Sequence, residues 1–142
     1  MTPDDVRLLR RAIALAAEGR AAGNAPFGSL LAGPDGEVLA EAYNTVLTDR
    51  DITAHPELKL ARWAARELDP ATAAATTMYT SCQPCVMCTG ALARSGLGRV
   101  VYALSGEQLA GLQPPGTGFG SVPQEGPGLY DEARVPVDGY YV

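Results

Sequence analysis

Residues 81–88 read Ser-Cys-Gln-Pro-Cys-Val-Met-Cys, and they mark a passage from a buried strand directly into a helix. The run Thr76–Ser81 before the helix is typical of a buried strand. Pro84 favours a helix start, because the missing N–H of proline is not needed in the first turn. The helix is expected to end near Arg94 and to be followed by a strand over Arg99–Leu104. This order of strand, helix and strand predicts an α/β fold.

The chain before residue 76 supplies further elements of the same fold. Helical spacing of apolar residues, the turn signal Gly33-Pro34-Asp35-Gly36 and the helix-stopping pair Asp69-Pro70 set their limits. The expected elements are a helix over residues 2–22, a hairpin of strands 27–32 and 37–43, a loop over 44–53 and a helix over 55–68. Two successive strand–helix–strand passages predict a mixed sheet with helices packed on its faces.

Length and composition are those of one compact domain. The chain has 142 residues, of which 46% are hydrophobic and 19% charged, so a single domain is expected over residues 1–142. Residues 105–142 form a Gly/Pro-rich C-terminal segment in which long regular structure is not expected. Every apolar run is far shorter than the roughly 20 residues of a membrane span, and a cytoplasmic protein is expected.

The charge of the chain argues against a nucleic-acid partner. The net charge is −5 and the pI is about 4.7, whereas binding to a phosphate backbone needs clustered lysine and arginine. A small molecule in a closed pocket is compatible with this charge. The segment 105–142 carries most of the net charge and is expected to wrap the domain as a solvated tail. Alternatively its end, Asp138–Val142 with Tyr140 and Tyr141, covers the active site or a neighbouring subunit.

Three candidate metal ligands and one candidate acid–base residue stand out. His55 is the only histidine, and it lies two residues before Glu57 at a predicted helix start. Cys85 and Cys88 are three residues apart, so they project from one face of a helical turn and can hold one metal ion. Two thiolates and a neutral imidazole would bind Zn²⁺ and leave a fourth position for water. Glu57 would relay protons beside that position.

A non-catalytic alternative uses the same residues. The third cysteine, Cys82, could join the other three ligands in a closed four-ligand structural zinc site, and Glu57 would then be a surface acid. The open site is favoured, because Cys82 lies on the strand side of the helix start and need not converge with the other thiols.

The pattern histidine-x-glutamate followed by Pro-Cys-x-x-Cys resembles the signature of the cytidine deaminase superfamily, in particular its branch of guanine deaminases and tRNA adenosine deaminases. Other segments also resemble that family, and the similarity covers about Val6 to Leu104. These segments are Ala25-Pro26-Phe27-Gly28-Ser29, Asn44 and Gly98-Arg99-Val100-Val101-Tyr102-Ala103. The resemblance implies a three-layer α/β/α sandwich with a five-stranded mixed sheet, a zinc ion between two helix N-termini and a homodimer.

The resemblance also implies an activity and roles for individual residues. A hydroxide on zinc, held by His55, Cys85 and Cys88, would attack the amino-bearing ring carbon of a base. Glu57 would move the protons, and ammonia would leave. The implied substrate-binding residues are Asn44, Phe27 and Pro84. The protein is thus expected to be a zinc-dependent aminohydrolase of a small purine-type base or nucleoside.

Three positions depart from the family pattern. Pro56 replaces the alanine common between histidine and glutamate, Gln83 replaces the usual glutamate, and Arg94 stands where relatives often carry an aromatic residue or histidine. The departures at Pro56 and Arg94 favour a non-guanine substrate such as the adenine-type nucleoside aminodeoxyfutalosine, whereas Gln83 predicts nothing about the substrate. Arg94 could meet a carboxylate of such a ligand, although an arginine late in a helix is more often a solvated residue.

Two other substrate classes stay open within the family. A tRNA adenosine deaminase is the runner-up, and the acidic charge of the chain opposes it. A pyrimidine such as cytosine or cytidine is the third choice. Asn44 and the pair Val86-Met87 resemble the purine-acting branch more closely.

Overall fold

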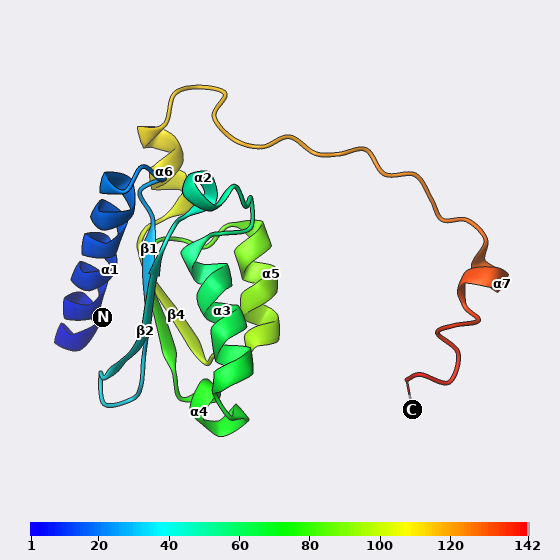
Figure 1. Ribbon diagram of the computed structural model, residues 1–142, viewed down its shortest axis with the longest axis horizontal. Helices are drawn as coiled ribbons and strands as arrows, with labels where there is room; N and C mark the ends of the chain where they lie inside the picture. Colours follow the sequence, from blue (N-terminus) through cyan, green and yellow to red (C-terminus); the bar gives the residue numbers. More distant parts are fainter. Residues whose placement is uncertain (142) are drawn as a thin grey trace.

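A mixed sheet of four strands forms the middle layer of the computed structural model, which describes residues 1–141 (Figure 1). The long helix α1 covers one face of the sheet, and α3 and α5 lie side by side on the other. The helices are α1 (Pro3–Ala21), α2 (Val46–Asp49), α3 (Pro56–Glu67), α4 (Pro70–Ala74), α5 (Val86–Ser95), α6 (Gly106–Leu112) and α7 (Tyr130–Ala133). The strands are β1 (Gly28–Ala32), β2 (Val38–Tyr43), β3 (Thr77–Cys82) and β4 (Arg99–Leu104).

The strand order is β2-β1-β3-β4, and the sheet contains both strand directions. Strand β1 pairs antiparallel with β2 and with β3, so that Leu30 lies opposite Glu41 on one side and Tyr79 on the other. Strands β3 and β4 run parallel, with Met78 opposite Val100, because α5 returns the chain across the face of the sheet. The three-layer α/β/α fold with a mixed sheet is therefore confirmed.

The expectation of five strands is wrong for residues 1–141, where the sheet has four. After β4 the chain turns into α6 and then enters a proline-containing segment with Pro114, Pro115, Pro123 and Pro127. A proline has no N–H to donate to a neighbouring strand. The segment therefore does not continue the ladder, and β4 is left as an edge strand.

The other predicted helices and strands are present, and four short helices, α2, α4, α6 and α7, were not predicted. The expected loop over 44–53 contains α2. Helix α3 ends just before the pair Asp69-Pro70, as predicted. Asp69 is also the N-cap residue of α4, because its carboxylate accepts hydrogen bonds from the backbone N–H and the hydroxyl of Thr72. In the described part of the chain, each helix is too short or too polar to span a bilayer.

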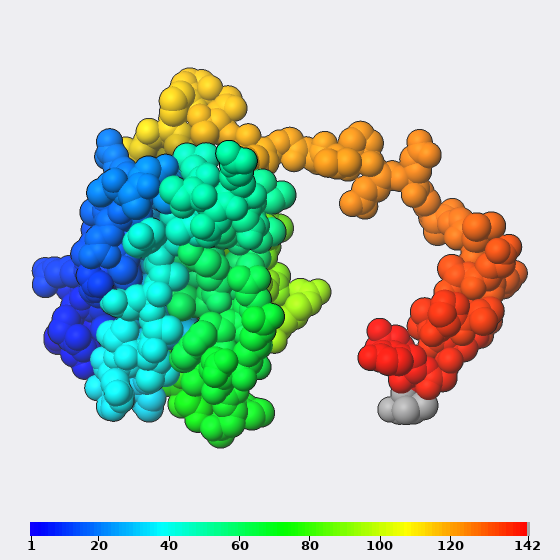
Figure 2. Space-filling view, in the orientation of Figure 1, coloured from blue at the N-terminus to red at the C-terminus, as the bar shows by residue number. Residues whose placement is uncertain are grey.

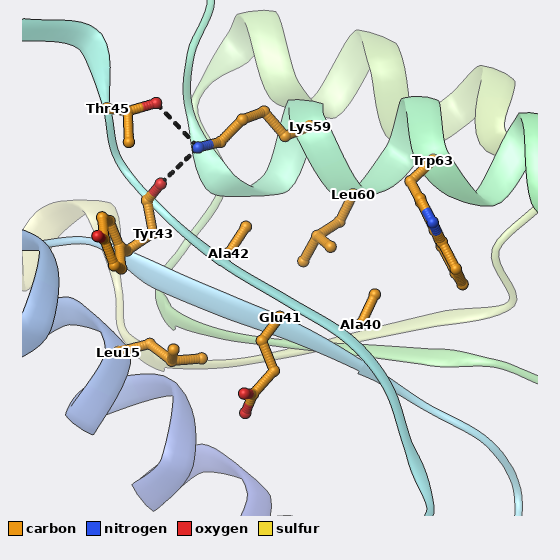
Figure 3. Close-up of a pocket in the computed structure, with 9 residues that line it drawn as sticks. All are labelled: Leu15, Ala40, Glu41, Ala42, Tyr43, Thr45, Lys59, Leu60 and Trp63. Carbon is orange, nitrogen blue, oxygen red and sulfur yellow. Dashed lines mark hydrogen bonds between the residues drawn. The ribbon is translucent and has the colours of Figure 1, made fainter. Parts of the chain in front are cut away.

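Helix α3 is tied to the edge strand β2 by the only lysine of the chain (Figure 3). Lys59 Nζ donates hydrogen bonds to Tyr43 O at 2.7 Å and to Thr45 Oγ1 at 2.9 Å. Trp63 lies one turn further along α3 and packs, half-buried, against the core. These contacts hold α3 across β2, which places the start of α3 at one end of the sheet.

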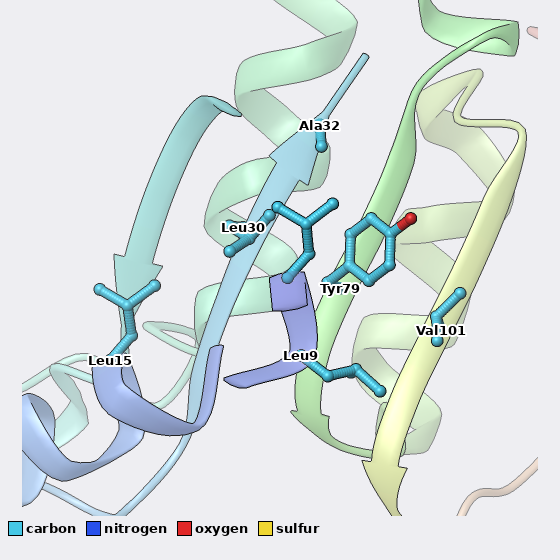
Figure 4. Close-up of a cluster of buried hydrophobic side chains, with 7 residues drawn as sticks. Leu9, Leu15, Leu30, Ala32, Tyr79 and Val101 are labelled. Atoms are coloured by element: carbon cyan, nitrogen blue, oxygen red, sulfur yellow. The ribbon is translucent and has the colours of Figure 1, made fainter. Parts of the chain in front are cut away.

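Two clusters of buried side chains fill the spaces on either side of the sheet. Leu30 and Leu31 are neighbours on β1, and both are fully buried, because successive side chains of a strand point to opposite faces. Leu31 lies on the side of α3 with Leu60, Ala64 and Met78. Leu30 belongs to the cluster drawn in Figure 4, which consists of Leu8, Leu9, Leu15, Leu30, Ala32, Tyr79 and Val101.

One buried carboxylate links α1 to two strands. Asp5 accepts hydrogen bonds from both terminal nitrogens of Arg99, at 3.1 and 2.9 Å, and from the hydroxyl of Tyr79 at 2.7 Å. It also completes a capping box with Thr2 at the start of α1. The Arg99 guanidinium, with further hydrogen bonds from Thr2 and Tyr79, holds the pKa of Asp5 well below its usual range. The charged carboxylate thus fixes α1 against β3 and β4 at neutral pH.

The segment after α6 leaves the domain instead of wrapping it, so the expectation of a wrapping tail is wrong. Residues 114–141, here named the C-terminal arm, are exposed throughout and run away from the sheet (Figures 1 and 2). Helix α7 and several turns fold the far end of the arm. Arg134 stabilises that end through an ion pair with Asp138 at 3.1 Å. Val142, part of the predicted covering segment, lies outside the described residues.

Gly28 allows α1 to approach the start of β1 closely. A Cβ atom at this position would lie 2.4 Å from the backbone nitrogen of Ala16 and 2.6 Å from the carbonyl oxygen of Ala12. Both are atoms of the helix backbone, which cannot rotate away as a flexible side chain could. Only glycine therefore fits between the helix and the strand.

The substitution Gly28→Ala is expected to lower the free energy of unfolding by about 3 kcal/mol or more, because overpacking against backbone forces α1 away from β1. Gly111→Ala is the matched control, since a Cβ atom there meets no atom within 4 Å. That control should be neutral or stabilise α6 by up to about 1 kcal/mol. Urea denaturation of the two variants measures the difference, and equal midpoints would contradict the packing argument.

Candidate active site

The N-termini of two helices face each other at one end of the sheet. His55 is the N-cap residue of α3, and Cys85 is the N-cap residue of α5. Neither side chain caps its own helix, although N-cap side chains commonly do so. Pro56 occupies the first position of α3 and sets its direction. The side chains of His55 and Cys85 are therefore free to meet across the gap between the helices.

The three predicted metal ligands come together in this gap. The Sγ atoms of Cys85 and Cys88 each lie 3.5 Å from His55 Nδ1, and all three ligand atoms lie within 4.8 Å of one another. A tetrahedral zinc ion with its usual bond lengths separates a sulfur ligand from a nitrogen ligand by about 3.6 Å. The donor atoms therefore fit zinc in both type and spacing.

The burial of the site also calls for a cation. Burial raises the pKa of the Cys88 thiol, and the nearby Glu57 carboxylate and Cys85 raise it further. A thiol in such a place stays protonated unless a positive charge compensates the thiolate. A zinc ion supplies that charge, and the N-terminal dipole of α5 adds to it.

Glu57 lies beside the ligands without being one of them. Its side chain is buried, and Glu57 Oε1 accepts a hydrogen bond from Ser29 Oγ at 3.3 Å. Ser29 is also bonded to Thr80 Oγ1 at 2.7 Å, so a chain of hydroxyl groups on β1 and β3 supports the carboxylate. Burial raises the pKa of Glu57. A carboxylate whose pKa is raised, and which binds no metal itself, is suited to accept a proton and pass it on.

A small cavity of about 80 Å³ adjoins the metal ligands. Its lining residues are Phe27, Asn44, His55, Pro56, Glu57, Cys82, Gln83, Cys85 and Leu109. The predicted contacts Asn44 and Phe27 are among them, whereas Pro84 is not. Asn44 Oδ1 accepts a hydrogen bond from Val46 N at 3.0 Å, which leaves the amide Nδ2 as a donor for the cavity. The larger hollow of Figure 3 has neither histidine nor cysteine in its lining.

Several residues of this site had no predicted role in it. Ser29 and Leu109 were not singled out as site residues, because a serine inside an apolar strand and a leucine in a Gly-rich stretch carry no local signal. Cys82 lines the cavity, but it is not part of the ligand cluster found among residues 1–141. This placement opposes the closed four-ligand alternative. Arg94 is exposed and donates to Gly90 O at 2.8 Å, so it keeps the solvated role.

Proteins of one family are similar to this chain in sequence and structure. Residues 2–104 match the family described as the cytidine and deoxycytidylate deaminase zinc-binding region. A probable cytosine deaminase of Schizosaccharomyces pombe is 31% identical, in an alignment that covers 99% of this chain and 94% of the relative. The tRNA-specific adenosine deaminase of Haemophilus influenzae is 31% identical over 101 residues, 71% of this chain and 58% of the relative.

Guanine deaminase of Bacillus subtilis is similar to this chain in both sequence and structure. It is 42% identical over 96 residues, which are 67% of this chain and 61% of the relative. Its X-ray structure superposes with a TM-score of 0.78 and 30% identity, over 99% of this chain and 94% of that one. The superposition thus extends beyond the sheet and helices into the C-terminal arm.

Removal of one ligand should empty the metal centre. The protein is expected to hold about one zinc ion per chain, and Cys88→Ala should abolish this binding because two protein ligands remain. Cys82→Ala is the matched control and should keep its zinc. Elemental analysis after dialysis against a weak chelator measures the zinc content. Equal loss of zinc from both variants would instead indicate a closed site with four protein ligands.

Proposed function

Because the chain belongs to the cytidine and deoxycytidylate deaminase family, whose members are zinc-dependent deaminases, we propose that it deaminates a small purine-type base or nucleoside. The candidates are guanine and an adenine-type nucleoside such as aminodeoxyfutalosine. The observation that carries the proposal is a buried carboxylate, Glu57, in the same cavity as the ligands His55 and Cys85. Metal-assisted hydrolysis needs this pairing of an ion with a non-ligand proton carrier.

The reaction replaces an amino group on a ring carbon by oxygen from water and releases ammonia. Zinc, when bound by His55, Cys85 and Cys88, makes water a nucleophile at neutral pH. Glu57 takes a proton from the attacking water and delivers it to the ring nitrogen next to the amino-bearing carbon. A second proton, carried by the same carboxylate, reaches the amino group, which then leaves as ammonia.

Other residues of the cavity orient the base for this proton transfer. Asn44 lines the cavity, and its Nδ2 would donate a hydrogen bond to a carbonyl oxygen or ring nitrogen of the substrate. Phe27, Pro56 and Leu109 supply apolar walls for a planar ring. Ser29 holds one oxygen of Glu57, so that the carboxylate keeps its position between substrate and ligands. The reacting ring would enter the cavity of about 80 Å³, and a sugar would lie at its opening.

Two alternative substrates are weighed by the charge of the chain and by its similarity to known proteins. A tRNA adenosine deaminase has support from similar proteins, but the net charge of −5 opposes a polyanionic substrate. A pyrimidine such as cytosine is favoured by the full-length similarity to a probable cytosine deaminase. Ammonia release from cytosine but from none of the purines would establish that alternative.

Replacement of Glu57 should separate catalysis from metal binding. Glu57→Gln is expected to keep its zinc and to lower turnover by roughly 100- to 10,000-fold, because the amide cannot carry the proton. Glu67→Gln, at the exposed end of the same helix, is the matched control. Ammonia release from guanine, adenosine, aminodeoxyfutalosine, cytosine and cytidine is the measurement. Undiminished turnover in Glu57→Gln would refute the proposed mechanism.

We also propose that the protein is a homodimer in which the C-terminal arm of one protomer lies on the other. The arm exposes large apolar side chains that its own domain does not cover, among them Phe119, Tyr130, Tyr140 and Tyr141. Exposed apolar residues also stand on α2, on the turn that follows it and on the first turn of α5, namely Leu47, Ile52 and Val86. Such surfaces commonly mark a protein interface.

The arm makes the dimer testable. The full chain is expected to have a mass in solution near twice the 14.8 kDa of one chain. The double substitution Tyr140→Ser and Tyr141→Ser should shift the equilibrium towards monomer, because it removes two aromatic side chains that would anchor the arm. Val38→Ser, an exposed apolar site on β2, is the control. Light scattering after gel filtration decides, and a monomeric wild-type chain would rule the dimer out.

A further inference from the structure

Helix α6 closes one side of the active-site cavity, but little burial of its side chains holds it in that position. It contains seven residues, and none of them is buried. Its side chain Leu109 lines the cavity of about 80 Å³ and also lines an apolar groove of about 670 Å³ on the α1 side. Phe27 and Cys82 are shared by both hollows in the same way. Leu109 therefore belongs to a thin wall that separates the reacting ring from the open groove.

The wall is anchored by a residue of the zinc motif. Gln83 Oε1 accepts a hydrogen bond from the backbone N–H of Gly106 at 2.9 Å, at the first turn of α6. Gln83 N donates to Leu104 O at 2.7 Å, just before the helix begins. The two hydrogen bonds hold the chain on both sides of Ser105, whose own hydroxyl caps α6. Gln83 also lines the cavity itself.

We propose that Gln83 is a positioning residue that holds α6 against the active site and so keeps Leu109 in the cavity wall. The proposal rests on the function proposed above and deepens it, since it assigns the wall that shields the reacting ring from water. The bond needs an oxygen acceptor at position 83, because the Gly106 N–H can only donate. Glutamate supplies such an oxygen as well as glutamine does, whereas alanine supplies none.

Hydrogen exchange of the zinc-loaded protein tests the anchor without any substrate. In Gln83→Ala the amides of residues 106–112 should exchange about fivefold faster, the factor for one hydrogen bond of about 1 kcal/mol. Gln83→Glu should restore slow exchange, because the carboxylate accepts the same bond. Gln113→Ala, at the other end of α6, is the matched control. Unchanged exchange in Gln83→Ala would overturn the proposal.

Steady-state kinetics test the consequence for the site. With the most active member of the base and nucleoside panel, Gln83→Ala should raise KM roughly fivefold while kcat changes less. Leu109→Ala should act in the same direction, and the double variant should be no worse than the worse single one, because both open one wall. Fully additive effects would overturn the link between the two residues. If no panel member releases ammonia, the proposed function fails, but hydrogen exchange still decides the role of Gln83.

Discussion

The site depends on one geometric constraint, which is that the first turns of α3 and α5 meet closely enough to share an ion. His55 and Cys85 are the N-cap residues, and their side chains point across the gap instead of capping their own helices. Cys88 follows in the first turn of α5 and is buried. Because burial disfavours its thiolate, the arrangement is compatible with function only when a cation is present.

The geometry of the site also depends on how the strands of the sheet are paired. Ser29 on β1 lies opposite Thr80 on β3 and also bonds Glu57 on α3, so the register of the two central strands sets the place of the carboxylate. On the far face, Asp5 binds Arg99 and thereby holds α1 to the strands that lead to the site. A shift of one strand would therefore displace the proton carrier from the ligands.

The three positions that depart from the family pattern have different roles in the folded chain. Pro56 forms part of the cavity lining and the first turn of α3 at once, so it shapes the pocket without weakening the helix. Arg94 lies away from the cavity and bonds its own helix. It therefore offers no reason to prefer a substrate with a carboxylate. Gln83 keeps the acceptor oxygen of the usual glutamate, which α6 requires.

The sequence by itself determined the strands, the main helices and the ligand set, because periodicity, prolines and the spacing of His55, Cys85 and Cys88 are local properties. It could not show that Asn44 and Leu109 meet at one cavity, because a separation of 65 residues along the chain does not determine the distance between them in the fold. The limit of four strands within residues 1–141 and the outward course of the C-terminal arm were likewise decided by tertiary structure. Pairing and packing depend on which surfaces come together, and that information exists only once the sheet has formed.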